Sequence, residues 1–139
     1  MPVITDAGLV GRIVSTSKNY SIAQILFNKD LKITIKAQRS RVDGILVYDG
    51  VSKLNVTNIP KNADVNVGDV IITSEFSNLF PSGLPIGTVT EAGNLDNLFK
   101  KIEIAPLVDF SSLENVFVLK YLANKERYFL EKSYQSPKK

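Results

Sequence analysis

The 139-residue sequence contains no cysteine, no histidine and no tryptophan. Without cysteine there is no disulfide framework and no thiolate metal site, and the redox compartment stays open. Without histidine the chain lacks both the commonest zinc ligand and the usual general base. No stretch approaches the roughly 18 consecutive apolar residues of a membrane-spanning helix, and "MPVITDAGLVGR" does not follow the signal-peptide pattern. We therefore expect no metal and no cofactor.

The net charge of +3 is concentrated at one end of the chain. Residues 120–139 hold six lysines and arginines against two glutamates, so the rest of the chain is nearly neutral. Such a basic segment could meet an anionic membrane or nucleic acid. However, aromatic and basic residues do not interleave along any strand, as an oligonucleotide-binding surface requires. We predict no nucleic-acid partner and a basic tail at 123–139 that is helical or disordered.

Short runs of β-branched and aromatic residues, separated by turn signals, dominate the sequence. In "LKITIKA", Leu31, Ile33, Ile35 and Ala37 fall on one face of an expected strand. The turn "NKD" at 28–30 predicts a hairpin that joins this strand to the preceding "AQILF". This pattern is typical of an all-β barrel or sandwich with about nine strands and little helix. The other expected strands are "LVGRIVS", "ILVY", "KLNVTN", "DVIITS", "PIGTVT", "KIEIAPL" and "NVFVLKY".

Candidate catalytic groups are few. Ser74 follows Thr73 at the end of an expected strand, but a serine nucleophile needs a base within hydrogen-bond reach. Lysine could replace histidine as that base, yet nothing in the sequence positions Lys53, Lys61 or Lys100. The aspartates fall at turns, where they have structural roles: Asp43, Asp49, Asp64 and Asp69. We therefore predict that the chain is not an enzyme, with a serine hydrolase acting through Ser74 as an alternative.

Glycine and proline indicate where the backbone forms tight turns, bulges or close contacts. Gly8 and Gly11 lack the third glycine and the following helix of a dinucleotide-binding fingerprint, so we expect a bulge or a close backbone approach at Gly11. In "FPSGLPIGTV", Pro81 favours a type I turn with Gly83 at its fourth position. Pro85 and Gly87 then predict a strand at an edge or at a bulge.

The order and spacing of several segments resemble one family. These segments are "DAGLVGRIV", "QRSRVDGIL", "IPKNADVNVGDVIITS", "LFPSGLPIGTV" and "LFKKIEIAPLVDFSSLENVFVL". Together they resemble, from Val3 to Tyr121, the extracytoplasmic β domain of the bacterial rod shape-determining MreC family. The residues that carry this structural signature are Gly8, Gly11, Gly68, Asp69, Phe80, Pro81, Gly83, Leu84, Pro85 and Gly87.

The resemblance implies a β region at 1–122 made of two closely coupled, barrel-like sub-domains with a loose likeness to trypsin. We expect their boundary near residue 40, with the second sub-domain at about 41–95. One departure is the sequence after Thr73 and Ser74, where Glu75–Asn78 replaces the glycine-rich run common in the family. Bulkier side chains restrict that loop, so a partner contact cannot be transferred onto 75–78 residue by residue.

The resemblance also implies a non-enzymatic scaffold of cell-wall elongation, which organises peptidoglycan synthases at the extracytoplasmic face of the inner membrane. The implied partners are the class B penicillin-binding protein of elongation, MreD and other copies of the chain, in a dimer or filament. The implied N-terminal membrane anchor and coiled coil are absent from this sequence, as expected for a fragment. Phe76, Leu79 and Phe80 either contact a partner or fill the core. A barrel-type module of a periplasmic adaptor is a second alternative.

Overall fold

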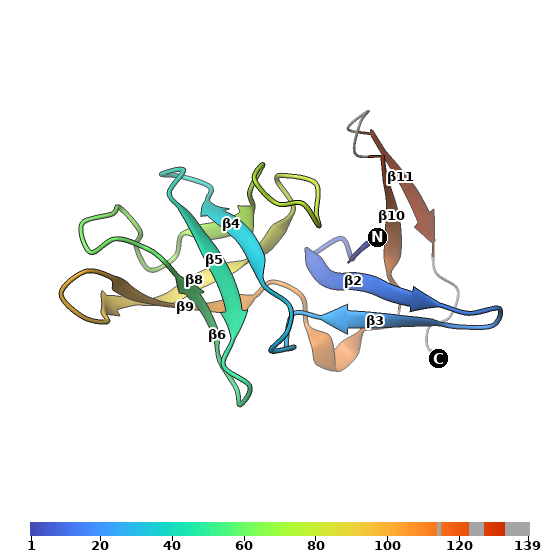
Figure 1. The fold of residues 1–139 in the computed structure, drawn as a ribbon, viewed down its shortest axis with the longest axis horizontal. Helices are drawn as coiled ribbons and strands as arrows, with labels where there is room; N and C mark the ends of the chain where they lie inside the picture. The colour runs from blue at the N-terminus through green and yellow to red at the C-terminus, as the bar shows by residue number, and fades with distance from the viewer. Residues whose placement is uncertain (114, 123–126, 133–139) are drawn as a thin grey trace.

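The computed structural model describes residues 1–113, 115–122 and 127–132, which form an all-β molecule (Figure 1). Its one helical element is the short 3-10 helix η1, Phe110–Ser112, and no helix in the described ranges is long and apolar enough to cross a membrane. The all-β class with little helix is therefore confirmed. The strands are β1 Pro2–Ile4, β2 Leu9–Thr16, β3 Ser21–Ile25, β4 Ile33–Ala37, β5 Asp43–Tyr48, β6 Leu54–Thr57, β7 Val70–Thr73, β8 Pro85–Asn94, β9 Lys100–Pro106, β10 Phe117–Leu122 and β11 Arg127–Lys132.

Six strands close into a barrel in the order β4-β5-β6-β9-β8-β7, with β4 pairing back onto β7. The inward face that the sequence predicts for this strand is confirmed, because Leu31, Ile33, Ile35 and Ala37 are all buried. The barrel therefore extends over residues 33–106, beyond the range of about 41–95 expected for the second sub-domain. The expected boundary near 40 falls inside the β4–β5 turn, since β4 is itself a barrel strand.

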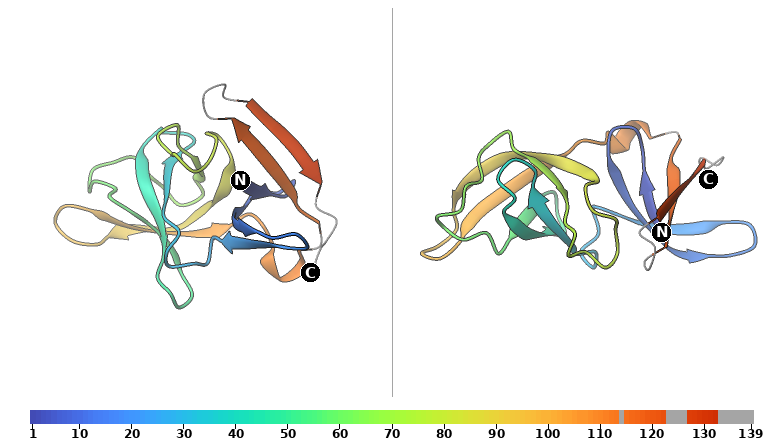
Figure 2. Two further views of the ribbon diagram at one scale, coloured as in Figure 1. Left: turned by 45° about the vertical axis from the view of Figure 1, so that its right-hand side comes forward. Right: turned by 90° about the horizontal axis from the view of Figure 1, so that it is seen from above.

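The remaining strands form a five-stranded sheet in the order β11-β10-β1-β2-β3, which lies beside the barrel (Figures 1 and 2). Both ends of the described chain contribute to this sheet, so the barrel is inserted between β3 and β10. The strand β11 covers residues 127–132, where the sequence predicted a helical or disordered tail, because its backbone pairs with β10 along its whole length. The rest of the predicted tail, 123–126 and 133–139, lies outside the described residues.

The hairpin predicted at 28–30 is wrong. Strand β3 pairs with β2, and β4 pairs with β5 and β7, so the turn carries the chain from the sheet into the barrel. Leu26 and Leu31, on either side of the turn, are both buried in the same core. Burying both leucines requires the chain to cross between the two layers, and a local hairpin would leave them on one sheet.

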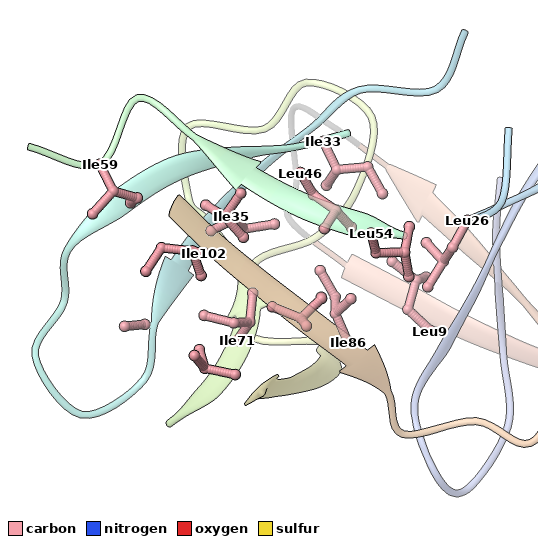
Figure 3. Packing of buried hydrophobic residues seen from close by; sticks show 14 of the residues in the cluster. Leu9, Leu26, Ile33, Ile35, Leu46, Leu54, Ile59, Ile71, Ile86 and Ile102 are labelled. Atoms are coloured by element: carbon pink, nitrogen blue, oxygen red, sulfur yellow. The ribbon is translucent and has the colours of Figure 1, made fainter. Parts of the chain in front are cut away.

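The sheet and the barrel share a hydrophobic core. Leu9 of β2 and Leu26 pack in one cluster with barrel residues such as Leu54 and Ile86 (Figure 3). At the same junction the ring of Phe27 meets the rings of Tyr48 and Phe110 edge to face, with centroid distances of 5.4 and 5.1 Å. The close coupling of the two β parts is therefore built from large apolar side chains, which resist independent movement.

Candidate functional site

The side chain of Thr73 is fully buried and holds the turn in the segment from Thr73 to Val89. The Thr73 hydroxyl donates to the carbonyl oxygen of Pro81 at 2.6 Å and accepts from the backbone N–H of Leu84 at 2.8 Å. The backbone of Thr73 also pairs with Leu84 and Gly83. The turn is thereby fixed against the end of β7, so this threonine acts as a structural residue.

The turn itself lies one residue later than the sequence predicted. Ser82 and Gly83 are its central residues, and Gly83 has φ of +87°, so Gly83 occupies the third position and not the fourth. A positive φ at the third residue is the requirement of a type II turn. The predicted type I turn is wrong because the Thr73 hydroxyl bridges Pro81 and Leu84, which moves the ends of the turn to these two residues.

The irregular strand expected after the turn is confirmed as a bulge. Strand β8 starts at Pro85, and its register against β7 shifts between Ile71 and Ile72. A Cβ atom at Gly87 would lie 2.3 Å from the carbonyl oxygen of Ala105 on β9, so only glycine permits this approach. Strand β8 pairs on both sides and is not a sheet edge.

Gly11 is likewise a site of close approach, as predicted. A Cβ atom there would lie 2.0 Å from the carbonyl oxygen of Gln24 on β3. A Cβ atom at Gly8 would lie 2.7 Å from the carbonyl oxygen of Pro85, which belongs to the barrel. Gly8 therefore sits where the sheet touches the barrel, and both glycines serve the packing of strands.

The three aromatic and aliphatic side chains considered as partner contacts separate into two groups. Phe80 is 1% exposed and belongs to the main core cluster, so it is unavailable to a partner and its prediction as a contact is corrected. Phe76 is 66% exposed and Leu79 is 37% exposed. Thr73 holds the carbonyl oxygen of Pro81, the residue after Phe80, whereas Phe76 and Leu79 lie in the loop before it.

Ser74 is fully buried, so its hydroxyl is closed to solvent and to a substrate. Its hydroxyl donates to a carboxylate oxygen of Asp43 at 3.3 Å and accepts from the backbone N–H of Phe76 at 3.0 Å. Lys36, on the neighbouring strand β4, has its ammonium group 2.6 Å from a carboxylate oxygen of Glu75. A hydroxyl bonded in this way caps a turn, and the geometry gives no support for a nucleophile.

Glu75, in the loop after Ser74, forms an ion pair with Lys36 of strand β4. Its hydrogen bond from Lys36 lowers the pKa of the carboxyl group, so the ion pair is formed at neutral pH. Lys36 is 7% exposed, and a buried ammonium needs such a partner. The loop after Ser74 is thus attached to the barrel by an ion pair.

Arg39 joins two acidic turn residues at the opposite end of β7. Its guanidinium donates to both carboxylate oxygens of Asp69 at 2.9 Å, and to those of Asp64 at 2.8 and 3.0 Å. Hydrogen bonds from Arg39 lower the pKa of both carboxyl groups and raise that of the arginine. Gly68, with φ of +95°, allows the turn that brings Asp69 into this position. The pairing is structural, because both carboxylates are fully engaged.

An apolar groove of about 370 Å³ lies beside strands β5, β6 and β9. We call it the barrel groove; its walls include Val47, Asn55, Thr57, Leu95, Phe99 and Lys101. Next to it, Leu95 and Leu98 are 61% and 69% exposed at the tip of the β8–β9 hairpin, which is at the end of the barrel away from the five-stranded sheet (Figure 1). A hollow with exposed apolar side chains is suited to binding another protein.

Sequence reasoning missed this groove. The apolar residues of "NLDNLF" at 94–99 were the available signal, since three large apolar side chains stand among polar residues there. Their exposure depends on Asp96, whose carboxylate accepts from the N–H groups of Leu98 and Phe99 at 2.8 and 2.9 Å and shapes the hairpin tip. No cluster of three or more acidic side chains that could hold a metal occurs among the described residues.

Comparison with known proteins identifies the chain's relatives. Residues 1–120 match the family model described as rod shape-determining protein MreC, barrel core. The chain is 28% identical over 120 residues to the cell shape-determining protein MreC of Escherichia coli K12, and 33% identical over 132 residues to that of Bacillus subtilis 168. These alignments cover 85% and 86% of the chain, but the chain spans only 33% and 46% of the relatives.

Solved structures share the fold. A structure of MreC superposes with a TM-score of 0.77 at 24% identity, covering 83% of this chain and 66% of the other. A complex between penicillin-binding protein PBP2 and MreC from Helicobacter pylori gives 0.66 at 18% identity, with 78% and 68% covered. The major periplasmic domain from the cell shape-determining filament MreC gives 0.62 at 20% identity, with 81% and 72% covered.

Proposed function

The chain belongs to the MreC family, whose barrel core it contains, and from this membership we propose that it is a non-enzymatic scaffold of bacterial cell-wall elongation. In this role it binds and organises peptidoglycan synthases and so controls cell shape. Binding acts by population shift, because a scaffold that prefers the active conformation of a synthase raises the fraction of active enzyme. The protein therefore needs a docking surface and no catalytic group.

The observation that carries this proposal is the barrel groove. An apolar hollow with Leu95 and Leu98 exposed at its border offers the apolar centre of a protein interface, while Asn55, Thr57 and Lys101 supply polar groups. Phe76 and Leu79 add a second exposed apolar pair, on the loop after Ser74. By contrast, the serine that an enzyme would use is buried and bonded to Asp43.

The relatives support the partners that we propose. The relative solved as a complex with PBP2 supports a class B penicillin-binding protein of elongation as the partner, and the relative described as part of a filament supports self-association. The same relative is described as a periplasmic domain, which supports a location on the extracytoplasmic face of the inner membrane. We include MreD among the partners, and an N-terminal anchor as the link to the membrane.

A binding measurement tests the proposal. The chain is titrated into the extracytoplasmic part of the cognate class B penicillin-binding protein by isothermal calorimetry. Leu95→Glu should weaken binding by about tenfold or more, which corresponds to the loss of roughly 1.4 kcal/mol. Val67→Glu is the matched control, since Val67 is 65% exposed and does not line the barrel groove. The variants are also expressed in cells, where Leu95→Glu should produce rounded cells. Absence of binding by the unaltered chain, together with normal shape of Leu95→Glu cells, would overturn the proposal.

The two alternatives receive less support. The serine hydrolase needs Ser74 to react, and labelling of Ser74 by a fluorophosphonate probe would restore that alternative. The adaptor module shares short strands and glycine–aspartate turns with this chain, but the family model that matches residues 1–120 is that of MreC.

A further inference from the structure

Strand β3 is the last strand at one edge of the five-stranded sheet. It pairs with β2 on one side, and on its other side no strand of the described residues lies against it. Figure 1 shows the β2–β3 hairpin reaching away from the barrel, so no barrel strand approaches this edge. An edge strand offers unpaired backbone N–H and C=O groups, which are a template for a further strand.

The hydrogen bonds of the hairpin determine which groups face outward. The N–H of Leu26 donates to the carbonyl oxygen of Val10, and the N–H of Ser17 donates to the carbonyl oxygen of Tyr20. The backbone N–H and C=O groups of Tyr20 and Leu26 therefore point toward β2. Because an antiparallel ladder alternates, positions 22 and 24 face β2 as well, and the backbone groups of Ser21, Ala23 and Ile25 face away from it.

The composition of β3 leaves this edge unprotected. Natural edge strands usually carry a lysine, a proline or a bulge of their own, which prevents pairing. The sequence of β3, "SIAQI", has no charged residue and no proline, and the bulge of this hairpin lies on β2 between Ile13 and Ser15. Ile22 and Ile25 are 52% and 36% exposed, and Ala23 is exposed between them. The strand is therefore uncharged, and it exposes apolar side chains on both faces, Ile22 on one and Ala23 and Ile25 on the other, beside the polar Gln24 and Ser21.

We propose that β3 is a self-association site, which pairs antiparallel with β3 of a second copy about a two-fold axis through Ala23. Ser21 then lies opposite Ile25 of the second copy, and the two sheets continue into each other. A second copy is the occupant because an antiparallel edge is complementary to itself, and because a strand without charge meets its copy without repulsion. This inference rests on the proposed scaffold function and specifies how copies of the scaffold associate.

The size of the contact sets its strength. A five-residue strand pair buries less than the roughly 1,200–2,000 Å² of stable interfaces, so the dimer should be weak in dilute solution. The dimer becomes populated where copies are held close together, because a high local concentration compensates for a weak affinity. The experiment therefore traps the pair covalently and does not depend on a stable dimer.

Cysteine trapping is suited to a chain that has no cysteine of its own. In the Ala23→Cys variant the two thiols meet across the axis, where directly opposite residues of a hydrogen-bonded pair have Cα atoms about 5.5 Å apart, within disulfide range. Mild oxidation should convert Ala23→Cys to a disulfide-linked dimer at least about tenfold faster than the control Val67→Cys. Mixing Ser21→Cys with Ile25→Cys should give the mixed dimer in preference to either homodimer, which tests the register.

Disruption gives the complementary result. Ala23→Lys places two ammonium groups opposite each other, so it should abolish trapping of the mixed Ser21→Cys and Ile25→Cys pair when it is introduced into both chains. Circular dichroism and an unchanged thermal midpoint verify that the variant is folded. Equal trapping rates for Ala23→Cys and Val67→Cys would overturn the inference, as would trapping that survives Ala23→Lys. If Ala23→Lys also abolishes synthase binding, β3 is a partner site and the inference fails, whereas absence of synthase binding by the unaltered chain defeats the proposed function alone.

Discussion

At the scale of single residues, the side chains of Thr73 and Arg39 hold neighbouring turns in place through several hydrogen bonds each. Each makes several hydrogen bonds beyond its own strand: Thr73 to the turn at 81–84 that follows it, and Arg39 to the more distant carboxylates of Asp64 and Asp69. A substitution at either position removes several hydrogen bonds at once. It should therefore lower the free energy of unfolding more than an ordinary surface substitution does.

Thr73→Val tests the hydroxyl. Valine keeps the shape of threonine but leaves the carbonyl oxygen of Pro81 and the N–H of Leu84 without their buried partner. We expect a loss of about 1–3 kcal/mol in the free energy of unfolding, measured by urea denaturation. Thr73→Ser keeps the hydroxyl and should retain more of the stability. Equal stability of Thr73→Val and the unaltered protein would contradict this role.

The Arg39 cluster predicts a pH dependence. Hydrogen bonds from Arg39 lower the pKa of Asp64 and Asp69 below the ordinary value of 3.8, so the folded protein binds fewer protons than the unfolded chain in acid. The stabilisation is complete above this ordinary value and is lost as the pH falls through the folded pKa values. Arg39→Gln should therefore flatten the fall of the urea midpoint below about pH 4.

A matched arginine provides the control for this experiment. Arg12 donates to the side-chain oxygen of Gln24 and, among the described residues, has no carboxylate partner. In the acid range Arg12→Gln should lower the urea midpoint equally at each pH, if it lowers it at all. The same acid slope for Arg39→Gln and the unaltered protein would contradict the assignment.

At the scale of the elements, close backbone approach determines where β8 can lie. Gly87 and Gly93 both belong to β8, but only Gly87 faces a backbone atom at short distance. A Cβ atom at Gly87 meets the carbonyl oxygen of Ala105 at 2.3 Å, whereas at Gly93 the nearest atom is the end of the Glu91 side chain at 3.8 Å. The same substitution on one strand should therefore have two different outcomes.

Gly87→Ala should displace β8 from β9 and destabilise the barrel by about 2 kcal/mol or more, as overpacking does. Gly93→Ala should change the free energy of unfolding by less than about 1 kcal/mol. Urea denaturation of the two variants measures both effects. A loss of similar size in the two variants would show that general strand propensity, and not the contact with Ala105, is responsible.

At the scale of the whole molecule, the shared core makes the sheet and the barrel one unit. Leu9 and Leu26 lie in the same cluster as barrel residues, and Phe27 contacts Tyr48 of β5 as well as Phe110. Because the two parts are fixed to each other, the barrel groove and the β3 edge keep a constant relative position, as the proposed scaffold function requires. That rigidity is useful if each copy must bind a synthase and another copy together.

Leu26→Ala tests the coupling. The truncation should cost about 2–5 kcal/mol, as for other fully buried leucines, and should lower the stability of sheet and barrel together. Differential scanning calorimetry should give one transition in both proteins, with equal calorimetric and van't Hoff enthalpies. Hydrogen exchange should be accelerated alike in β2 and β5. Two separate transitions, or faster exchange in β2 alone, would contradict the single unit.

The sequence by itself determined the all-β class, the position of most strands, the inward face of β4, the close approach at Gly11 and, through the order of its segments, the family. These are local properties, since a period of two selects the face of a strand and a turn residue selects the backbone conformation. It did not determine that β3 pairs with β2 and not with β4, or that Phe80 is buried while Phe76 is exposed. Those outcomes were decided by the tertiary structure, because alternation does not specify a pairing partner, and because the burial of a loop side chain depends on how the loop packs on the core.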